Sequence, residues 1–184
     1  MATTPLIWQA AQQTADKVRE LHARPDGQVD LEALCESLEI RVTHTDALPA
    51  GTSGMLIKKS DDERPRIYIN STESAVRQRF TLAHEIGHYM ERITIVKDND
   101  FSFRDERGTK YDLHEFYADQ FAGALLMPLK LILRAFPDLI NNHDSLTLSL
   151  AAFDVADMFN VSYSAAAHRL GRLVKQGELQ AAAA

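Results

Sequence analysis

The stretch that decides the fold is Thr81-Leu-Ala-His-Glu-Ile-Gly-His-Tyr-Met90, near the middle of the chain. Residues four apart on an α-helix lie on the same face, so the imidazoles of His84 and His88 can reach one metal ion. Neutral imidazole is a good zinc ligand, and Glu85 stands where a general base acting on water is needed. This stretch therefore predicts a zinc site with hydrolytic chemistry on a helix.

The residues around this stretch predict a helix that the protein core surrounds on most sides. At 100° per residue, two adjoining apolar arcs cover most of its circumference. These arcs consist of Val76, Phe80, Ala83, Gly87 and Met90, and of Leu82, Ile86, Tyr89 and Ile93. The two histidines and Glu85 occupy the remaining polar sector together with Arg77 and Thr81. We expect this helix at about 72–92, after a capping box at 70–73.

A second predicted helix, at about 111–127, supplies the candidate for a third ligand. Glu115 and Asp119 lie one turn apart on it and share a face with the small residues Ala118 and Ala122, which permit close approach to the first helix. An unpaired carboxylate on a largely buried helix is costly. We therefore predict that Glu115 binds the metal and that Asp119 accepts a hydrogen bond from one of the two ligand imidazoles.

The other elements follow from hydrophobic periodicity and turn residues. Further helices are predicted at 6–23 and 30–38, and a shorter one follows Pro128 and ends at Phe136. Two more are predicted between 146 and 179, divided near Asn160. Strands are predicted at 40–45, 54–58 and 66–70, of which the last two form a hairpin. Residues 97–110 are charged and lack periodicity, which predicts a loop.

Composition limits the classes of protein to be considered. The chain has 184 residues, 45% hydrophobic and 25% charged, as is usual for one globular domain with a small appendage. A net charge of −6 disfavours binding to nucleic acid, and a single cysteine, Cys35, excludes a cysteine-based zinc cluster. The N-terminus lacks a secretion signal, and Pro128, Lys130 and Arg134 interrupt the longest apolar stretch. We expect a cytoplasmic protein that makes no contact with a membrane.

Three motifs resemble those of the ImmA/IrrE family of bacterial metallopeptidases. They are His84-Glu-Ile-Gly-His88, Phe101-Ser-Phe-Arg-Asp105, and the run from Glu115-Phe-Tyr-Ala-Asp119 to Pro128. The resemblance implies a minimal gluzincin-like α+β fold, mainly helical, with a small, mostly antiparallel sheet. It divides the chain into a zincin-like domain at 1–140 and a helical, helix-turn-helix-like segment at 141–184.

The same resemblance implies functions for the site residues and a class of substrate. His84, His88 and Glu115 would bind one Zn²⁺ per chain, and Glu85 would be catalytic. Members of the family act on repressors of the Xre helix-turn-helix type, which relieves repression of stress-response or mobile-element genes. The protein is therefore expected to be a zinc-dependent endopeptidase with such a repressor as its partner. The alternative is a regulatory protein that binds a repressor, or DNA, without cleavage.

The alternative of DNA binding rests on the sequence of the C-terminal segment. Residues 154–173 have the cadence of a helix-turn-helix, and the residues after Lys175 could begin a wing. Three basic and three acidic residues between 151 and 178 cancel, however, which disfavours direct DNA binding. We interpret the segment as a packing or partner-docking module.

Two features of the catalytic machinery stay open at this level. The group that stabilises the oxyanion has five candidates, and His114, turned away from Glu115 by about 100°, is not expected to be a metal ligand. These candidates are Tyr89, Tyr111, Tyr117, His114 and Arg104. Residues 67–69 form either an edge strand that pairs with an extended substrate or an ordinary half-buried strand.

Overall fold

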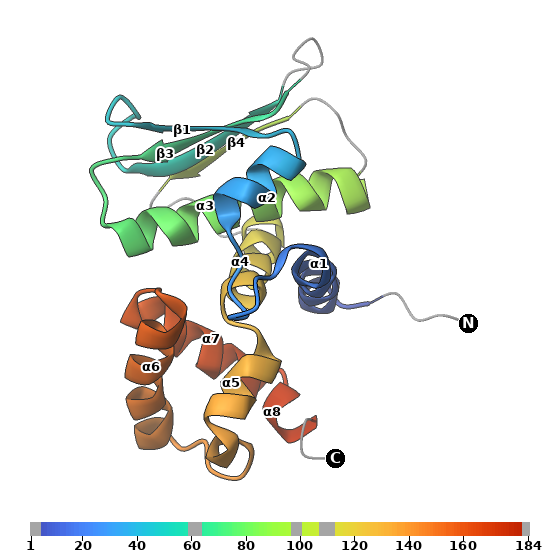
Figure 1. Ribbon diagram of the computed structural model, residues 1–184, viewed down its shortest axis with the longest axis vertical. Coiled ribbons are helices and arrows are strands. Elements are labelled where there is room, and N and C mark those ends of the chain that lie inside the picture. Colours follow the sequence, from blue (N-terminus) through green and yellow to red (C-terminus); the bar gives the residue numbers. More distant parts are fainter. Residues whose placement is uncertain (1–4, 59–63, 97–100, 107–112, 182–184) are drawn as a thin grey trace. The chain divides into compact units, whose positions relative to one another are not determined.

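The computed structural model describes residues 5–58, 64–96, 101–106 and 113–181 (Figure 1). The chain divides into two compact units, residues 1–125 and 126–184. Helices and one small sheet make up the first unit, and the described part of the second unit is helical, so the expected α+β fold is confirmed. The sequence predicts a boundary at residue 140, between a zincin-like domain and a helical segment. The two compact units do not test that functional division, which stays a prediction.

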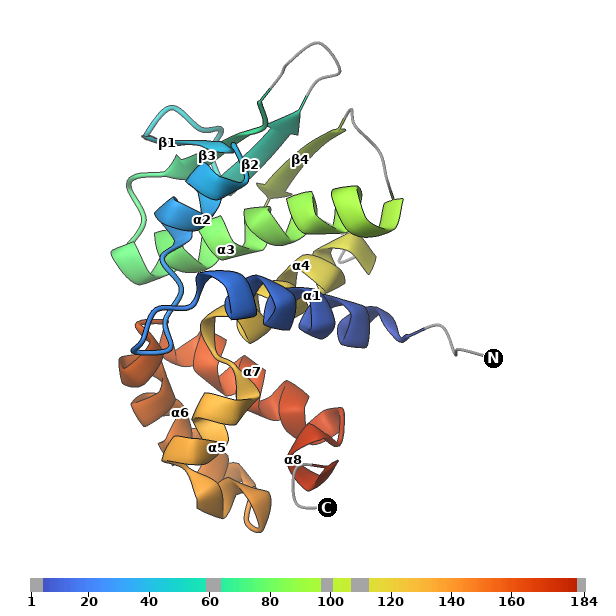
Figure 2. The same cartoon turned by 45° about the vertical axis from the view of Figure 1, so that its right-hand side comes forward.

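In the first unit, three strands lie between two pairs of helices in the sequence, and a fourth strand lies between the last two helices. Its elements are α1 (Ile7–His22), α2 (Leu31–Ser37), β1 (Arg41–Thr45), β2 (Thr52–Lys58), β3 (Arg66–Asn70), α3 (Ala75–Glu91), a π-helical turn (Arg92–Val96), β4 (Phe101–Glu106) and α4 (Leu113–Leu126). In Figures 1 and 2, α3 lies across one face of the sheet, and α1 and α4 lie on the side of α3 away from the strands. The first unit is therefore layered around α3.

The sheet has the strand order β1-β3-β2-β4. β1 pairs with β3 in parallel, whereas β2 is antiparallel to both β3 and β4, so the sheet is mostly antiparallel as expected. Ile67 and Ile69 of β3 are fully buried and alternate with more exposed neighbours, the pattern of a strand with one face on the core.

The strand order decides one alternative that the sequence left open and corrects one prediction. β3 lies between β1 and β2, so residues 67–69 are not an edge strand that could pair with a substrate, and the alternative of an ordinary half-buried strand is confirmed. Residues 101–106, predicted as loop, form β4, which pairs with β2 from Lys58↔Phe101 to Thr52↔Glu106. The hydrogen bonds that make β4 a strand come from a partner far away in sequence, so its own side chains carry little signal.

The start of α3 also differs from the prediction. The helix begins at Ala75 with Ser74 as its N-cap, and no side chain caps it there. Asn70 instead closes the preceding turn, because its Oδ1 accepts hydrogen bonds from the backbone nitrogen of Thr72 (3.0 Å) and from its hydroxyl (2.7 Å). Asn70 to Glu73 therefore form a side-chain-stabilised turn rather than a capping box.

Close packing of α3 against α4 depends on Gly87. A Cβ added at Gly87 would lie 3.0 Å from the Cα of Ala118 and 3.1 Å from both its carbonyl oxygen and Cδ1 of Phe121. Backbone atoms cannot move aside as a flexible side chain can, so only glycine fits this position well. The close approach expected from Ala118 is therefore present, with glycine opposite it on α3.

The second unit contains two longer helices divided where the sequence predicted. Its elements are α5 (Leu129–Ala135), a 3₁₀ turn (Pro137–Ile140), α6 (Ser145–Phe159), α7 (Tyr163–Lys175) and α8 (Glu178–Ala181). Asn160 ends α6 in the left-handed conformation, and the hydroxyl of Ser162 caps α7 by accepting from the backbone nitrogen of Ala165 (3.2 Å). The wing suggested after Lys175 is absent, because residues 178–181 are helical.

The described helices differ from membrane-spanning helices in length and hydropathy. None of these helices is by itself both long and apolar enough to cross a bilayer. α4 and α5 reach the limits of length and composition only when they are taken together as a bent pair.

Gly87→Ala tests the contact between α3 and α4. Alanine favours a helix by about 1 kcal/mol over glycine, but overpacking costs roughly 1–3 kcal/mol, so we expect a net loss of stability of about 1 kcal/mol. Gly171→Ala in α7 is the matched control, because its Cβ would have no atom within 4 Å, and it should be neutral or stabilising. Equal urea-denaturation midpoints for the two variants would contradict the close contact.

Candidate metal centre

Three side chains from two helices converge in the first unit. His84 and His88 of α3 and Glu115 of α4 each offer a ligand atom, and these atoms all lie within 4.8 Å of one another. Both histidines are buried, whereas Glu115 is partly exposed. The structure thus brings together the three residues that the sequence proposed as metal ligands.

The distances within this cluster suit a small tetrahedral ion. Nε2 of His84 lies 3.2 Å from Oε2 of Glu115, and Nε2 of His88 lies 3.2 Å from its Oε1. Nitrogen and oxygen ligands about 2.0–2.1 Å from a tetrahedral zinc ion are separated by roughly 3.3 Å. The two imidazole rings are close, with centroids 4.7 Å apart and planes at 85° to each other. The donor set and its spacing fit zinc.

Asp119 lies one turn beyond Glu115 on α4 and contacts the first histidine. Its Oδ1 is 3.1 Å from Nδ1 of His84. A proton on Nδ1 donated to this carboxylate leaves the lone pair of Nε2 facing Glu115. Of the two imidazoles that the sequence left open for Asp119, the structure pairs it with His84.

Electrostatic coupling in this cluster stabilises a charged imidazole beside charged carboxylates. Burial by itself would lower the pKa of His84, but hydrogen bonds with Asp119 and Glu115 outweigh burial and raise the pKa to about 10. Burial likewise opposes ionisation of Glu115, yet hydrogen bonds with His84 and His88 hold the pKa of Glu115 well below its ordinary range. Without metal, the positive charge of a protonated His84 occupies the place that suits a cation.

Glu85 lies on the side of α3 that faces the sheet. It is fully buried, and a Cβ at Gly54 of β2 would come within 2.7 Å of its Oε1 and 2.5 Å of the Cγ2 of Thr81. The missing side chain at Gly54 therefore makes room for the carboxylate of Glu85. The sequence analysis did not identify Gly54, although a glycine inside a strand is a signal for the close approach of another group.

Two of the five candidates for oxyanion stabilisation, Tyr117 and His114, have surroundings that explain them structurally. Tyr117 is fully buried, with its hydroxyl beside Thr14 and Thr94. Nδ1 of His114 lies 3.0 Å from both carboxylate oxygens of the buried Glu91, which links the first turn of α4 to α3.

The other three candidates are Tyr89, Tyr111 and Arg104. Tyr89 lies near Glu39, outside the metal cluster. Tyr111 and the side chain of Arg104 lie outside the described part of the chain.

Comparison with known proteins places this geometry in context. A family model for Peptidase_M78, described as the IrrE N-terminal-like domain, matches residues 35–171, which include the whole cluster. No curated protein matches this chain in a sequence search. Among solved structures, a Mycobacterium tuberculosis transcriptional regulator shares the fold, with a TM-score of 0.51 and 17% identity over 89% of this chain and 46% of that chain. This chain thus spans less than half the length of that regulator.

Asp119→Asn should weaken metal binding, because it removes the charge that favours a proton on Nδ1 of His84. Loss of such a hydrogen-bonding partner typically lowers metal affinity about 10- to 100-fold. Competition with a chelating dye measures the change in Kd for zinc. Asp157→Asn, an exposed acid of α6, is the matched control and should bind zinc like the wild type. An unaltered Kd for Asp119→Asn would remove Asp119 from this role.

Metal affinity should rise with pH near neutrality. Because the pKa of His84 is raised to about 10 in the metal-free protein, zinc must displace a proton that is bound at pH 7. We expect release of about one proton from His84 at pH 7, and an affinity that rises about tenfold per pH unit between pH 6 and 8. Titration calorimetry in buffers of different ionisation enthalpy counts the protons, and zero release would contradict the raised pKa.

The same pKa shifts set the stability of the metal-free protein. The contribution of His84 is complete below its ordinary pKa of 6.5 and is lost as pH rises through about 10. The contribution of Glu115 is complete above its ordinary pKa of 4.5 and is lost as pH falls toward its lowered pKa. Both contributions are therefore complete between pH 4.5 and 6.5. Urea denaturation of the chelated protein at pH values below, within and above this range measures the effect, and we expect the highest stability within it.

Proposed function

Given that this chain belongs to the IrrE N-terminal-like family of peptidases, M78, we propose that it is a zinc-dependent endopeptidase. The observation that carries the proposal is the convergence of His84, His88 and Glu115, whose donor atoms lie within 4.8 Å of one another. Two neutral imidazoles and one carboxylate are a usual donor set for a catalytic zinc ion that keeps one position open. We propose one such ion per chain.

The proposed reaction is hydrolysis of a peptide bond. A zinc ion held by these three residues supplies Lewis acidity to a water molecule and to the scissile carbonyl. Glu85 accepts the proton of the attacking water and transfers it to the nitrogen of the leaving amine. Asp119 holds the proton on Nδ1 of His84, so that the imidazole keeps one orientation throughout the reaction.

The proposed substrate is a transcriptional repressor of the Xre helix-turn-helix type, in the cytoplasm. Cleavage of such a repressor would induce the stress-response or mobile-element genes that it controls. The family supports a protein substrate, and a structure with the same fold is described as a transcriptional regulator. This chain covers only 46% of that regulator, so the regulator's partners are not assigned to this chain.

A non-cleaving regulator is the second candidate, and its DNA-binding form is disfavoured. Arg169 of α7 is only 4% exposed, and its Nε donates to the carbonyl oxygen of Met127 (3.3 Å). Packing within the second unit therefore occupies one of the three basic residues counted for that segment. Arg172 and Lys175 remain against Asp154, Asp157 and Glu178, which leaves the segment acidic. The other form of this candidate, a protein that binds a repressor without cleaving it, is the one to test.

Glu85→Gln distinguishes cleavage from binding alone. The variant keeps all three ligands, so it should hold zinc like the wild type, yet it should lose at least about 100-fold in cleavage rate because glutamine cannot accept the proton. Wild type and variant are incubated with the repressor encoded by the neighbouring gene, and products are identified by mass spectrometry. Glu36→Gln, at an exposed position of α2, is the control and should cleave normally.

Two results would contradict the proposal. Cleavage by Glu85→Gln at the wild-type rate would remove Glu85 as the base. Capture of intact repressor by zinc-loaded wild type, with no product, would favour the non-cleaving regulator.

A further inference from the structure

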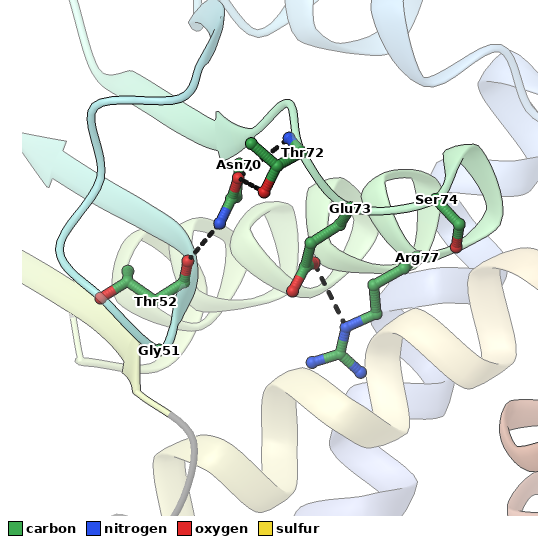
Figure 3. A pocket seen from close by; sticks show the side chains of 7 residues that line it. All are labelled: Gly51, Thr52, Asn70, Thr72, Glu73, Ser74 and Arg77. Carbon is green, nitrogen blue, oxygen red and sulfur yellow. Dashed lines mark hydrogen bonds and ion pairs between the residues drawn. The ribbon is translucent and has the colours of Figure 1, made fainter.

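A polar cavity of about 450 Å³ lies where β2 begins and α3 starts (Figure 3). Residues of β2, of the turn after β3 and of the first turn of α3 line it, and the only charged side chains among them are Glu73 and Arg77. Asn70 makes this wall rigid, because its Nδ2 donates to the carbonyl oxygen of Thr52 (3.1 Å) while its Oδ1 accepts from Thr72. The cavity is therefore built before any ligand binds.

Ser53 and Glu73 both contact Arg77 at this cavity. Its Nη2 donates to the hydroxyl of Ser53 (3.2 Å), and its Nε lies 3.5 Å from Oε2 of Glu73. The hydroxyl of Ser53 in turn donates to Oε1 of Glu73 (3.0 Å). The side chain of Arg77 is 43% exposed and that of Glu73 only 9%, so the guanidinium rather than the carboxylate is what a ligand would meet.

Two paths through the structure link the cavity to the metal cluster. Arg77 lies on the same stripe of α3 as His84 and His88, because residues seven and eleven positions apart fall on one helical face. Along β2, Thr52 lines the cavity and Gly54 contacts Glu85. Eight residues of helix, from Arg77 to Glu85, span about 12 Å. An extended peptide covers that distance with three or four residues.

We propose that this cavity is a substrate subsite in which Arg77 binds an acidic side chain of the peptide, three or four residues from the scissile bond. The inference rests on the proposed peptidase function and adds a sequence preference to it. A carboxylate suits the site because the exposed guanidinium edge and the hydroxyl of Ser74, which caps no helix nitrogen, both donate hydrogen bonds. Glu73 has its carboxylate turned to Ser53 and Arg77, so it orients the guanidinium.

The test uses pairs of fluorogenic peptides based on one sequence that the wild type cleaves. Within a pair only one residue differs, Glu or Gln, and this residue is moved from one to six positions on either side of the scissile bond. We expect the Glu peptide to have about tenfold higher kcat/KM at the third or fourth position on one side, chiefly through KM. The preference should shrink in high salt, because the arginine is partly exposed.

Variants assign the preference to Arg77. Arg77→Gln should abolish the Glu-over-Gln ratio, and Arg77→Lys should restore part of it because the charge returns without the forked geometry. Arg41→Gln, at an exposed position of β1, is the matched control and should keep the wild-type ratio. Thermal unfolding of each variant checks that the first unit stays folded.

A binding measurement separates this inference from the proposed function. Zinc-loaded Glu85→Gln is titrated with the fluorescently labelled Glu and Gln peptides, and anisotropy gives the two Kd values. Tighter binding of the Glu peptide by about tenfold, lost in the Glu85→Gln and Arg77→Gln double variant, supports the subsite. Equal Kd values, or a ratio that Arg77→Gln leaves unaltered, overturn the subsite even where cleavage occurs. Failure of the wild type to cleave any peptide overturns the peptidase function instead.

Discussion

The candidate metal centre depends on one carboxylate placed between two imidazoles that belong to another helix. Glu115 lies 3.2 Å from both His84 and His88, and such distances are possible only where α4 approaches α3 closely. Gly87 and Ala118 permit that approach, because any Cβ on the glycine would press on the backbone opposite. A packing constraint at the residue next to His88 therefore controls whether the three donors can share an ion.

A single strand of the sheet, β2, contacts both the proposed catalytic base and the proposed subsite. β2 packs on α3, and at Gly54 the carboxylate of Glu85 and the methyl group of Thr81 occupy the space of the missing side chain. The preceding residue, Ser53, orients Glu73 and Arg77 through its hydroxyl. Two adjacent residues of one strand thus contact the proposed base and the proposed subsite, so a shift of β2 would disturb both together.

Local patterns were reliable where a helix has its own apolar face, and weak where pairing partners are distant. The helix that carries the histidines, the break at Asn160 and the strand at 66–70 were all predicted from local sequence patterns. β4 was missed, and the place of β3 in the sheet was left open, because strand order depends on which distant segments pair. The capping box at Asn70 failed for a local reason, since an Asn side chain can close its own turn instead of capping a helix.

The sequence by itself determined the candidate ligands on the first helix, because two histidines one turn apart on a helix share one face whatever surrounds it. It also determined that Glu115 and Asp119 share a face of a second helix. Only the tertiary structure decided that Asp119 pairs with His84, that Gly54 makes room for Glu85, and that Arg77 lines a cavity on the same face of α3. Each of these contacts joins residues from different elements, and no periodicity within one element records the position of another.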